Sequence, residues 1–592
     1  MQMAAVGPVI PTLRFRPTAE RRSQGRLKPE LQTRNRLKAE LQTGGIPTSM
    51  TAHLHIDGAT VAAPLGVSVF DCAEQVDVHV PTSCHKQGKC RECLVEVVTG
   101  MKLLSERTSE EDSLADGFRL SCRARVVGEL GDIRCHTMRR SEIRVEEGGV
   151  SVAARLDPAV TRRGDTVFLD GREIATWQGP LHGLAADIGT TTVVLRLVDL
   201  EHGSVVAAQS FENPQRFGGS DVMARITYDS NHPGRLLQRT LLGYLRRAIE
   251  DFHVPADSIF EMVVVGNSTM RDLLFGLDVE SIGQRPYRSI VEHEFRAGER
   301  ETTSVSVAPK RLRLPMHANG RICSLPLVSG HVGADAAACL LAVGMQDEQR
   351  QVALMDVGTN TEFFIGNRDR LFAASCPAGP AFEGGLVSCG MPGLEGAIER
   401  VALTGDRVEV NVIGGVEPTG VCGSGLVDLL SELLRTGQMN SLGRYTDDAE
   451  SYVIDSERSI SLSEQDISNL AQAKAANIAG LRIVMSRAGL RLDDIEVFYL
   501  AGGFARHLDI DAARRIGFIP DLPDDKIRLI GNAAIEGATT ALLSSSQRDE
   551  FERFIRGIEH VELETDERFF DYFVDGCQFI RVRDEGGADG LA

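Results

Sequence analysis

The chain of 592 residues has no apolar run of about 18 residues or more, so no membrane-spanning helix is expected. Aromatic residues make up only 5% of it, with Trp177 the single tryptophan. They form no stripe with basic side chains of the kind that binds single-stranded nucleic acid. The net charge of −19 also argues against a nucleic-acid partner.

Cysteine is scarce as well, with 12 residues in the whole chain, which is too few for a disulfide scaffold. No secretory signal peptide is evident, so we expect reduced thiols in a cytoplasmic protein. The sequence has neither a Walker A motif nor Gly-x-Gly-x-x-Gly after a strand. These absences disfavour P-loop and Rossmann nucleotide sites.

The first 50 residues are poor in acidic side chains: nine Lys and Arg residues stand against three Asp and Glu, which leaves a net charge of −25 for the remainder. An Arg-rich, acid-poor start is typical of a targeting peptide. However, the segment has no strand pattern and no sustained helical stripe. We therefore interpret residues 1–50 as a disordered extension or a start codon assigned too early. Met50 opens the first segment that looks folded.

What the chain does contain is a set of four cysteines spaced Cys-x5-Cys-x2-Cys, with a fourth 29 positions later. This spacing is close to that of plant-type [2Fe–2S] ferredoxins, with one more residue in the first gap. Three thiolates then reach one small cluster from a single loop, and Gly88 lets backbone N–H groups approach the sulfides. The predicted ligands are Cys84, Cys90, Cys93 and Cys122.

Residues 51–136 therefore resemble a β-grasp [2Fe–2S] ferredoxin, with a hairpin at Asp57-Gly58 and a short helix at 68–75. A structural zinc site uses the same ligand type, but such sites usually show two Cys-x2-Cys pairs, and one is present here. Unliganded cysteines are the other alternative. Residues 137–182 read as a charged linker with strand-like pieces.

Two segments further along share an apolar strand, Asp-x-Gly-Thr-x-Thr and a second strand, 169 residues apart. Tight Gly turns expose backbone N–H groups, and Thr hydroxyls add donors suited to phosphate oxygens. The Asp of each turn is placed to hold Mg²⁺. The candidate residues are Asp187, Gly189, Thr190, Thr191 and Thr192 in the first copy, and Asp356, Gly358, Thr359, Asn360 and Glu362 in the second.

A third apolar strand, 497–501, ends in Gly502-Gly503, where a flat adenosine has room to lie against the backbone. Gly423 and Gly425 open a predicted helix over 426–434, and helix N-termini suit anions. Together these motifs resemble the acetate kinase/sugar kinase/Hsp70/actin superfamily, built from duplicated ribonuclease H-like halves. A duplicated α/β domain without a nucleotide is the alternative.

The order of these parts resembles the reductive activators of corrinoid enzymes. The resemblance covers residues from about 51 to 584 and rests on 187–192, 265–270, 329–338, 356–362, 379–385, 420–430 and 501–504. The sequence departs from the family at Thr361, where members have Gly, although the acid at Glu362 is kept.

The resemblance implies an α+β and α/β multidomain fold: a ferredoxin-like domain (51–136), a linker (137–182), a middle domain or first half (183–322) and an ATPase-like second half (323–592). It implies a [2Fe–2S] cluster, ATP with Mg²⁺, catalytic roles for Asp187, Asp356 and Glu362, and a homodimer. The implied function is ATP-dependent reduction of a corrinoid methyltransferase protein from Co(II) to Co(I).

Three alternatives remain open at this point: an activator of a radical dehydratase, a redox sensor with a nucleotide-binding module, and a small-molecule kinase with an electron-transfer appendage. The complete four-Cys set disfavours the first, because such activators need no ferredoxin domain. The sequence does not name the corrinoid protein, the methyl donor or the electron donor.

Overall fold

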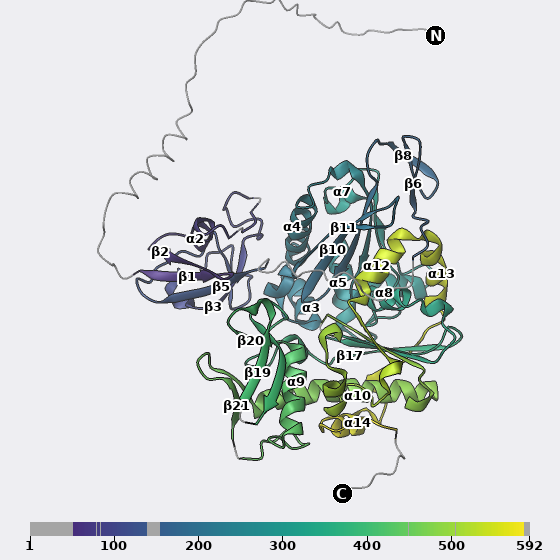
Figure 1. Cartoon of the computed structure of the whole chain (residues 1–592). Helices are drawn as coiled ribbons and strands as arrows, with labels where there is room; N and C mark the ends of the chain where they lie inside the picture. The colour runs from purple at the N-terminus through teal and green to yellow at the C-terminus, as the bar shows by residue number, and fades with distance from the viewer. Residues whose placement is uncertain are drawn as a thin grey trace, which may run out of the picture. The chain divides into compact units, whose positions relative to one another are not determined.

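The structure is a computed structural model that describes residues 51–138 and 154–584, except residues 79, 83, 406, 448 and 504 (Figure 1). The predicted N-terminal extension, residues 1–50, lies outside the described residues, as does part of the predicted linker. Most of the helices and strands belong to three sheets and the helices packed on them.

The first sheet has five strands in the order β2-β1-β5-β3-β4. β1 pairs antiparallel with β2 and parallel with β5, and the helix α2 (Val69–Gln75) packs on β1 and β2. This mixed sheet with one helix confirms the predicted β-grasp fold. The strands are β1 (Ala52–Ile56), β2 (Ala59–Ala63), β3 (Leu94–Thr99), β4 (Phe118–Leu120) and β5 (Asp132–Thr137).

Local signals in the sequence explain both the hairpin and the helix. Asp57 and Gly58 have φ angles of 46° and 82°, the left-handed values that a tight two-residue hairpin turn needs. The Ser68 side chain accepts a hydrogen bond from the Asp71 N–H and so caps the first turn of α2. The predicted turn and helix are therefore confirmed.

Part of the predicted linker is folded. It contains a three-stranded antiparallel sheet, made of β6 (Val160–Arg163), β7 (Thr166–Leu169) and β8 (Arg172–Thr176). Val167, in the strand-like piece expected from the sequence, is fully buried.

The second sheet has the strand order β11-β10-β9-β12-β14-β13. Its first three strands form an antiparallel meander, whereas β12 runs parallel to β9 and β14 parallel to β12. Every residue of β9 and β12 is buried, as expected for central strands covered on both faces. The strands are β9 (His182–Ile188), β10 (Thr192–Asp199), β11 (Val205–Glu212), β12 (Ile259–Val265), β13 (Ser306–Val307) and β14 (Arg321–Ser324).

The third sheet repeats this arrangement, with the order β24-β23-β15-β16-β17-β25. β15, β16 and β17 form the antiparallel meander, and β23 and β24 continue parallel to β15. The predicted duplication is therefore present in the topology itself. The strands are β15 (Val352–Val357), β16 (Thr361–Gly366), β17 (Leu371–Cys376), β23 (Val497–Ala501), β24 (Ile527–Gly531) and β25 (Glu559–His560).

Helices cover these two sheets. After β24 the chain leaves the third sheet and returns to the second. α12 packs on β9 and β12 and lies against α8, as Figure 1 also shows. The two helices approach closely at Gly537, whose missing side chain leaves room for the Ala338 carbonyl. The main helices are α3 (Val222–Asn231), α4 (Leu236–Glu250), α5 (Ser268–Phe275), α8 (Ala334–Ala342), α9 (Gly423–Arg435), α10 (Glu464–Ala488), α12 (Ala533–Leu543), α13 (Ser545–Ile555) and α14 (Phe569–Gly576).

The remaining strands form two small sheets, and in the sequence they lie between β17 and β23. The first contains β18 (Ala397–Thr404), β19 (Arg407–Val412) and β20 (Gly420–Val421), and the second contains β21 (Ser451–Asp455) and β22 (Ile460–Ser463). The predicted boundary between residues 322 and 323 falls inside β14. We therefore propose to divide the halves just before β15 instead.

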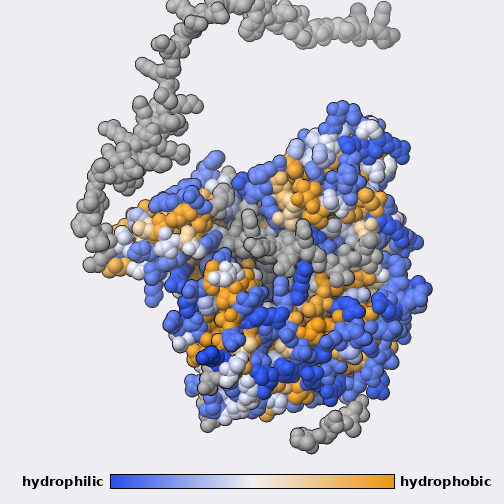
Figure 2. Space-filling view, in the orientation of Figure 1, coloured by the Kyte–Doolittle hydropathy of each residue, from blue (hydrophilic) through white to orange (hydrophobic). Residues whose placement is uncertain are grey.

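Among the described residues, no helix is both long and apolar enough to cross a membrane. Figure 2 shows a face covered mostly by hydrophilic residues, with hydrophobic residues gathered in separate patches. In the ferredoxin-like part, the exposed apolar side chains are Leu65, Val98, Val127 and Leu130.

Candidate cluster site and nucleotide cleft

The loop that carries the first three cysteines has an unusual backbone. His85, Lys86, Gly88 and Arg91 all have positive φ angles, between 51° and 74°. Successive left-handed residues turn several N–H groups toward one point and so form an anion-binding concavity. A side chain at Gly88 would place its Cβ 2.8 Å from Nε of Arg123 and displace that side chain, and the positive φ also favours glycine there.

Backbone N–H groups of this concavity donate hydrogen bonds to cysteine sulfurs. The backbone N–H groups of Gln87, Lys89 and Cys90 donate to the Cys84 sulfur, and that of Gly88 donates to Cys122. Burial raises the pKa of Cys84, but the hydrogen bonds from Cys90 and its neighbours outweigh it and bring the pKa down to about 7. The predicted approach of backbone N–H groups to the sulfurs is therefore present.

The four thiols form two pairs. Cys84 is hydrogen-bonded to Cys90, and Cys93 Sγ lies 3.3 Å from Cys122 Sγ. The hydrogen bond from Cys93 lowers the pKa of Cys122, which favours the thiolate form that metals bind. Cys93 and Cys122 are buried, whereas Cys84 and Cys90 are half-buried.

This arrangement fits a [2Fe–2S] cluster. The cluster takes four thiolates, two on each iron, and the structure supplies four thiols as two pairs. Nowhere in the described residues do three or more His, Cys, Asp or Glu side chains gather closely enough to hold one metal ion. A structural zinc ion would take the same four thiols around a single point, so the preference for the cluster rests on the ligand spacing.

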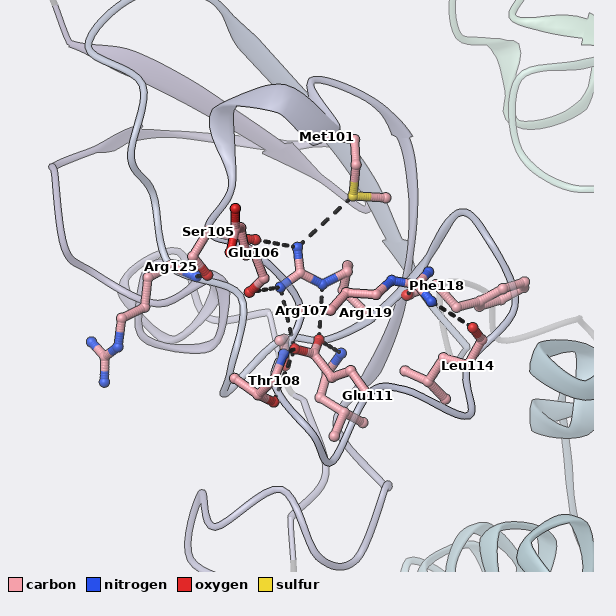
Figure 3. Close-up of polar contacts among 12 residues, drawn as sticks. Met101, Ser105, Glu106, Arg107, Thr108, Glu111, Leu114, Phe118, Arg119 and Arg125 are labelled. Atoms are coloured by element: carbon pink, nitrogen blue, oxygen red, sulfur yellow. Dashed lines mark hydrogen bonds and ion pairs between the residues drawn. The ribbon is translucent and has the colours of Figure 1, made fainter. Parts of the chain in front are cut away.

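A buried ion pair supports the segment that carries Cys122 (Figure 3). Arg119, in β4, donates from Nε to Glu111 at 2.8 Å, and both side chains are almost fully buried. Glu111 also accepts from the Leu120 N–H at 2.9 Å, and Arg119 donates to the Ser105 carbonyl at 2.9 Å. The pair thus ties β4 to the loop before it, two residues from Cys122. Neither residue was predicted from the sequence.

Both predicted phosphate turns connect the first and second strands of their sheets. Gly189–Thr191 joins β9 to β10, and residues 358–360 join β15 to β16. The Gly189 N–H donates to the Thr192 carbonyl at 3.0 Å, and a Cβ at Gly189 would lie 2.6 Å from that oxygen. The Gly358 N–H bonds one position earlier in its turn, to the Asn360 carbonyl at 3.1 Å. The two turns therefore share their sequence and their place between the first two strands of each sheet, but the second turn is one residue tighter.

A single carboxylate connects the two turns. Glu383 accepts a hydrogen bond from Thr359 Oγ1 at 2.7 Å and another from Thr191 Oγ1 at 3.1 Å. Glu383 lies in the loop 377–385, to which the sequence assigned no chemistry. The structure therefore brings together the two turns that were predicted to hold a polyphosphate, and binding there stays a prediction.

Buried carboxyl groups surround the turns. Burial raises the pKa of Asp187 to about 7 and that of Asp335 to about 8, to which the charge of Asp187 also contributes. Burial raises the pKa values of Asp356 and Glu362 in the same direction. These groups repel one another when ionised, and their oxygens are the hard donors that Mg²⁺ prefers. Mg²⁺ commonly takes only one or two such carboxylates together with water, and its binding here stays a prediction.

Amide side chains complete the cleft. Asn532 donates to Asp187 at 3.0 Å, and Asn267 donates to Thr190 Oγ1 at 2.9 Å. Asn267 belongs to the Gly-rich turn 265–269 that the sequence placed near the cleft, but its role was not predicted. Asn532 has no motif around it, and its only sequence signal is its position as the N-cap of α12.

The remaining predicted glycines differ in their positions. Gly502 packs directly on the Val357 carbonyl, at the end of β15, so it lies beside the second turn. A Cβ at Gly503 would meet nothing within 4 Å, which leaves that surface open. Gly425 packs instead on the Ile398 carbonyl in β18, and Gly423 begins α9. For Gly425 the contact with β18 already explains the glycine, and a nucleotide contact there stays a prediction.

Three family models match successive parts of the chain. Residues 54–127 match the 2Fe-2S iron-sulfur cluster binding domain, residues 182–348 the RACo middle region, and residues 350–585 the C-terminal domain of RACo, the ASKHA domain. The first match supports a [2Fe–2S] cluster. The ASKHA match agrees with the duplicated sheets and is consistent with ATP binding.

Known proteins share this organisation over most of their length. The corrinoid activation enzyme RamQ of Eubacterium limosum is 26% identical over 86% of this chain and 96% of the relative. The [Co(II) methylated amine-specific corrinoid protein] reductase of Methanosarcina barkeri is 22% identical over 67% of this chain and 76% of its own. A 2Fe-2S ferredoxin of Escherichia coli is 32% identical over 12% of this chain.

A solved structure agrees with these relatives. The reductive activator for corrinoid, iron-sulfur protein superposes with a TM-score of 0.65 at 26% identity, covering 90% of this chain and 98% of that one. The RACo matches occupy most of residues 182–585, and the cluster domain precedes them in the same order. With its paired thiols and duplicated phosphate turns, the chain belongs to the family of reductive activators of corrinoid proteins.

Proposed function

We propose that the chain reduces the cobalt of a corrinoid protein from Co(II) to Co(I) by one electron, in a reaction coupled to ATP. The observation that carries this proposal is the presence in one chain of two thiol pairs and two phosphate turns joined through Glu383. The first feature suits electron delivery, and the second suits a nucleotide that controls it. The corrinoid protein is the substrate, as the names of the relatives suggest.

The energetics explain why a nucleotide would be needed. A bound plant-type [2Fe–2S] cluster supplies one electron at about −400 mV. Because Co(I) is a strongly reducing state, transfer to Co(II) at that potential is unfavourable without further help. ATP can supply it by changing the affinity for the two corrinoid states, which is a coupling free energy between two sites.

The chain's own residues have distinct parts in this proposal. Cys84, Cys90, Cys93 and Cys122 hold the cluster, with Cys93 and Cys122 on its buried side and Cys84 and Cys90 on its half-buried side. The turns at Gly189–Thr192 and Gly358–Asn360 bind the phosphates, and Asp187 and Asp356 hold Mg²⁺ beside them. Gly502 and Gly503 provide the surface for adenosine.

The test is anaerobic reduction of a purified corrinoid partner by the purified chain and a chemical reductant, followed by the absorption of Co(I). We expect Co(I) only when ATP is present, and none with Cys122→Ser. A non-hydrolysable ATP analogue separates binding from hydrolysis as the driving step. Equal rates with and without ATP contradict the proposal, and a redox-active chain that binds no nucleotide favours the redox-sensor alternative. Light scattering tests the proposed homodimer.

A further inference from the structure

Arg225 is a fully buried cation that has no carboxylate within ion-pair distance among the residues that the structure describes. It lies in α3, and its side chain is 0% exposed. The guanidinium donates from Nη2 to the Thr190 carbonyl at 2.7 Å, from Nε to the Gly219 carbonyl at 3.0 Å, and from Nη1 to the Met270 sulfur at 3.0 Å. All three acceptors are neutral, so the charge is solvated by dipoles only.

Other deeply buried arginines of this chain are paired. Arg119 is bound to Glu111, and Arg271 is bound to Asp272 at 2.6 Å with both side chains fully buried. The charges nearest Arg225 are Arg216, which repels it, and Asp221. Burial lowers the pKa of Arg225, the direction expected for a cation that lacks a counter-ion. A buried charge of this kind is costly, so its presence calls for an anion.

The place where Arg225 binds identifies that anion. Thr190 is the middle residue of the first phosphate turn. Because the peptide between Thr190 and Thr191 is planar and trans, a carbonyl directed at Arg225 directs the Thr191 N–H the opposite way. Thr191 Oγ1 donates to Glu383 of the second half, so this residue lies between the two turns. Arg225 thus orients a peptide whose N–H donor belongs to the proposed phosphate site.

Charge balance supports the same conclusion. The buried carboxyl groups at the turns, Asp187, Asp335 and Asp356, oppose the entry of a polyphosphate. The side chains of Asn213 and Asn267 also donate to the first turn, at 2.8 and 2.9 Å, but they are neutral. Arg225 adds a full positive charge at hydrogen-bond distance from the turn, in a setting from which water is excluded and charges act strongly.

We propose that Arg225 is a positioning residue for nucleotide phosphate: it orients the Thr190–Thr191 peptide and offsets the phosphate charge from behind the turn. This inference rests on the proposed binding of ATP. It predicts an effect that depends on the charge of the ligand, because Arg225 acts on the phosphates and not on adenosine.

The test compares ATP, ADP and adenosine binding by calorimetry in the full chain, wild-type and Arg225→Gln. We expect Arg225→Gln to weaken ATP binding by about tenfold or more, with ADP affected less and adenosine changed by less than about twofold. Arg225→Lys, which keeps the charge, should recover part of the loss. Arg271→Lys is the matched control: it changes another buried arginine of the same half and should leave the ATP-to-adenosine ratio unchanged.

The possible failures are separate. If the wild-type chain binds ATP no better than adenosine, the proposed function fails and the inference fails with it. If the wild-type chain binds ATP and a folded Arg225→Gln binds it equally well, or loses ATP and adenosine alike, only the inference is overturned. If Arg225→Gln does not fold, the inference is tested by ATP binding to Arg225→Lys and by tripolyphosphate binding to the wild-type chain. Tripolyphosphate should protect residues 189–192 and 219–226 from hydrogen exchange, and no protection overturns the inference.

Discussion

Thr191 donates a hydrogen bond to Glu383 at 3.1 Å, although 192 positions separate the two residues in the chain. The donor lies in the first phosphate turn and the acceptor in a loop of the second half. Since Thr359 of the second turn donates to the same carboxylate oxygen, Glu383 occupies the position between two sets of donors suited to phosphate. A bound phosphate would compete with this carboxylate for both hydroxyls.

Removing the charge of Glu383 should therefore strengthen nucleotide binding. We expect Glu383→Gln to bind ATP about three- to tenfold more tightly, because a neutral amide does not repel the phosphates. Calorimetric titration measures the change. Glu395→Gln, an exposed residue of the same half, is the control and should bind ATP like the wild-type chain. Weaker binding by Glu383→Gln would instead mean that the carboxylate holds the turns in their binding geometry.

The thiol pairs predict which cysteine substitutions remove the cluster. We expect Cys93→Ser or Cys122→Ser to abolish the visible absorption of the protein and its two irons and two sulfides, because each removes half of one pair. Iron and sulfide analysis with EPR of the reduced protein measures the loss. Cys135→Ser is the control, because Cys135 is buried but lacks ligand spacing. Full cluster content in Cys122→Ser would refute the assignment.

The sequence predicted those features whose functional residues lie close together along the chain. The cysteine spacing, the Asp-x-Gly-Thr turns and the Asp57-Gly58 hairpin each depend on residues within one short segment. Two strongly apolar strands before equivalent turns also indicated the duplication, and the repeated strand order bears it out. The β-grasp sheet followed from the same kind of local evidence.

The features that the sequence did not predict depend on contacts between distant segments. Arg225 and Asn532 reach the turns from a helix and a helix N-cap that no motif marks. Glu383 lies in the recognised segment 379–385, but nothing in that segment indicates a contact with both turns. Arg119 and Glu111 carry no signal of burial in the sequence, and only the fold brings them together as a buried pair. The 322/323 boundary fell inside β14 because a strand of only four residues gives little periodicity.

The buried pair beside Cys122 predicts a large effect from a small substitution. We expect Glu111→Gln to destabilise the ferredoxin-like part by about 3–5 kcal/mol, because it leaves the buried guanidinium of Arg119 without its counter-charge. The double variant Glu111→Leu with Arg119→Met should recover most of this loss. Thermal unfolding, followed by loss of the cluster absorption, measures the difference.

The adjacent residue provides a matched control. Glu110 pairs with Arg123 at 2.9 Å, but each side chain is 32% exposed, so Glu110→Gln should lower the stability much less than Glu111→Gln does. Equal stability of the two single variants would show that burial of the Arg119–Glu111 pair does not matter.

The same pair makes the ferredoxin-like part sensitive to acid. Burial raises the pKa of Glu111, but hydrogen bonds from Arg119 and from the Thr108 and Leu120 N–H groups outweigh it and hold the pKa below its usual value. A group with a depressed pKa in the folded state adds stability above its unfolded pKa of about 4.3, and this stability disappears as the pH falls further. Unfolding midpoints should therefore decrease more steeply below about pH 4.5 in the wild-type chain than in the double variant. Parallel profiles would contradict this.

Asp187 should separate the metal-dependent part of nucleotide binding from the rest. The Asp187→Asn variant loses an oxygen ligand for Mg²⁺ and also one negative charge, so it should bind MgATP about tenfold less tightly and metal-free ATP more tightly. Because burial raises the pKa of Asp187 to about 7, a fraction of the molecules carry a proton on Asp187 at neutral pH, and Mg²⁺ has to displace that proton. Titrations in two buffers with different ionisation enthalpies should detect proton release in the wild-type chain and less of it in Asp187→Asn.

The control is Asp199→Asn, at the far end of the same strand pair. It changes the net charge equally and should alter neither affinity. If Asp187→Asn shifts the affinities for MgATP and free ATP in the same direction, Asp187 holds no metal and the first turn binds phosphate through its hydrogen-bond donors alone.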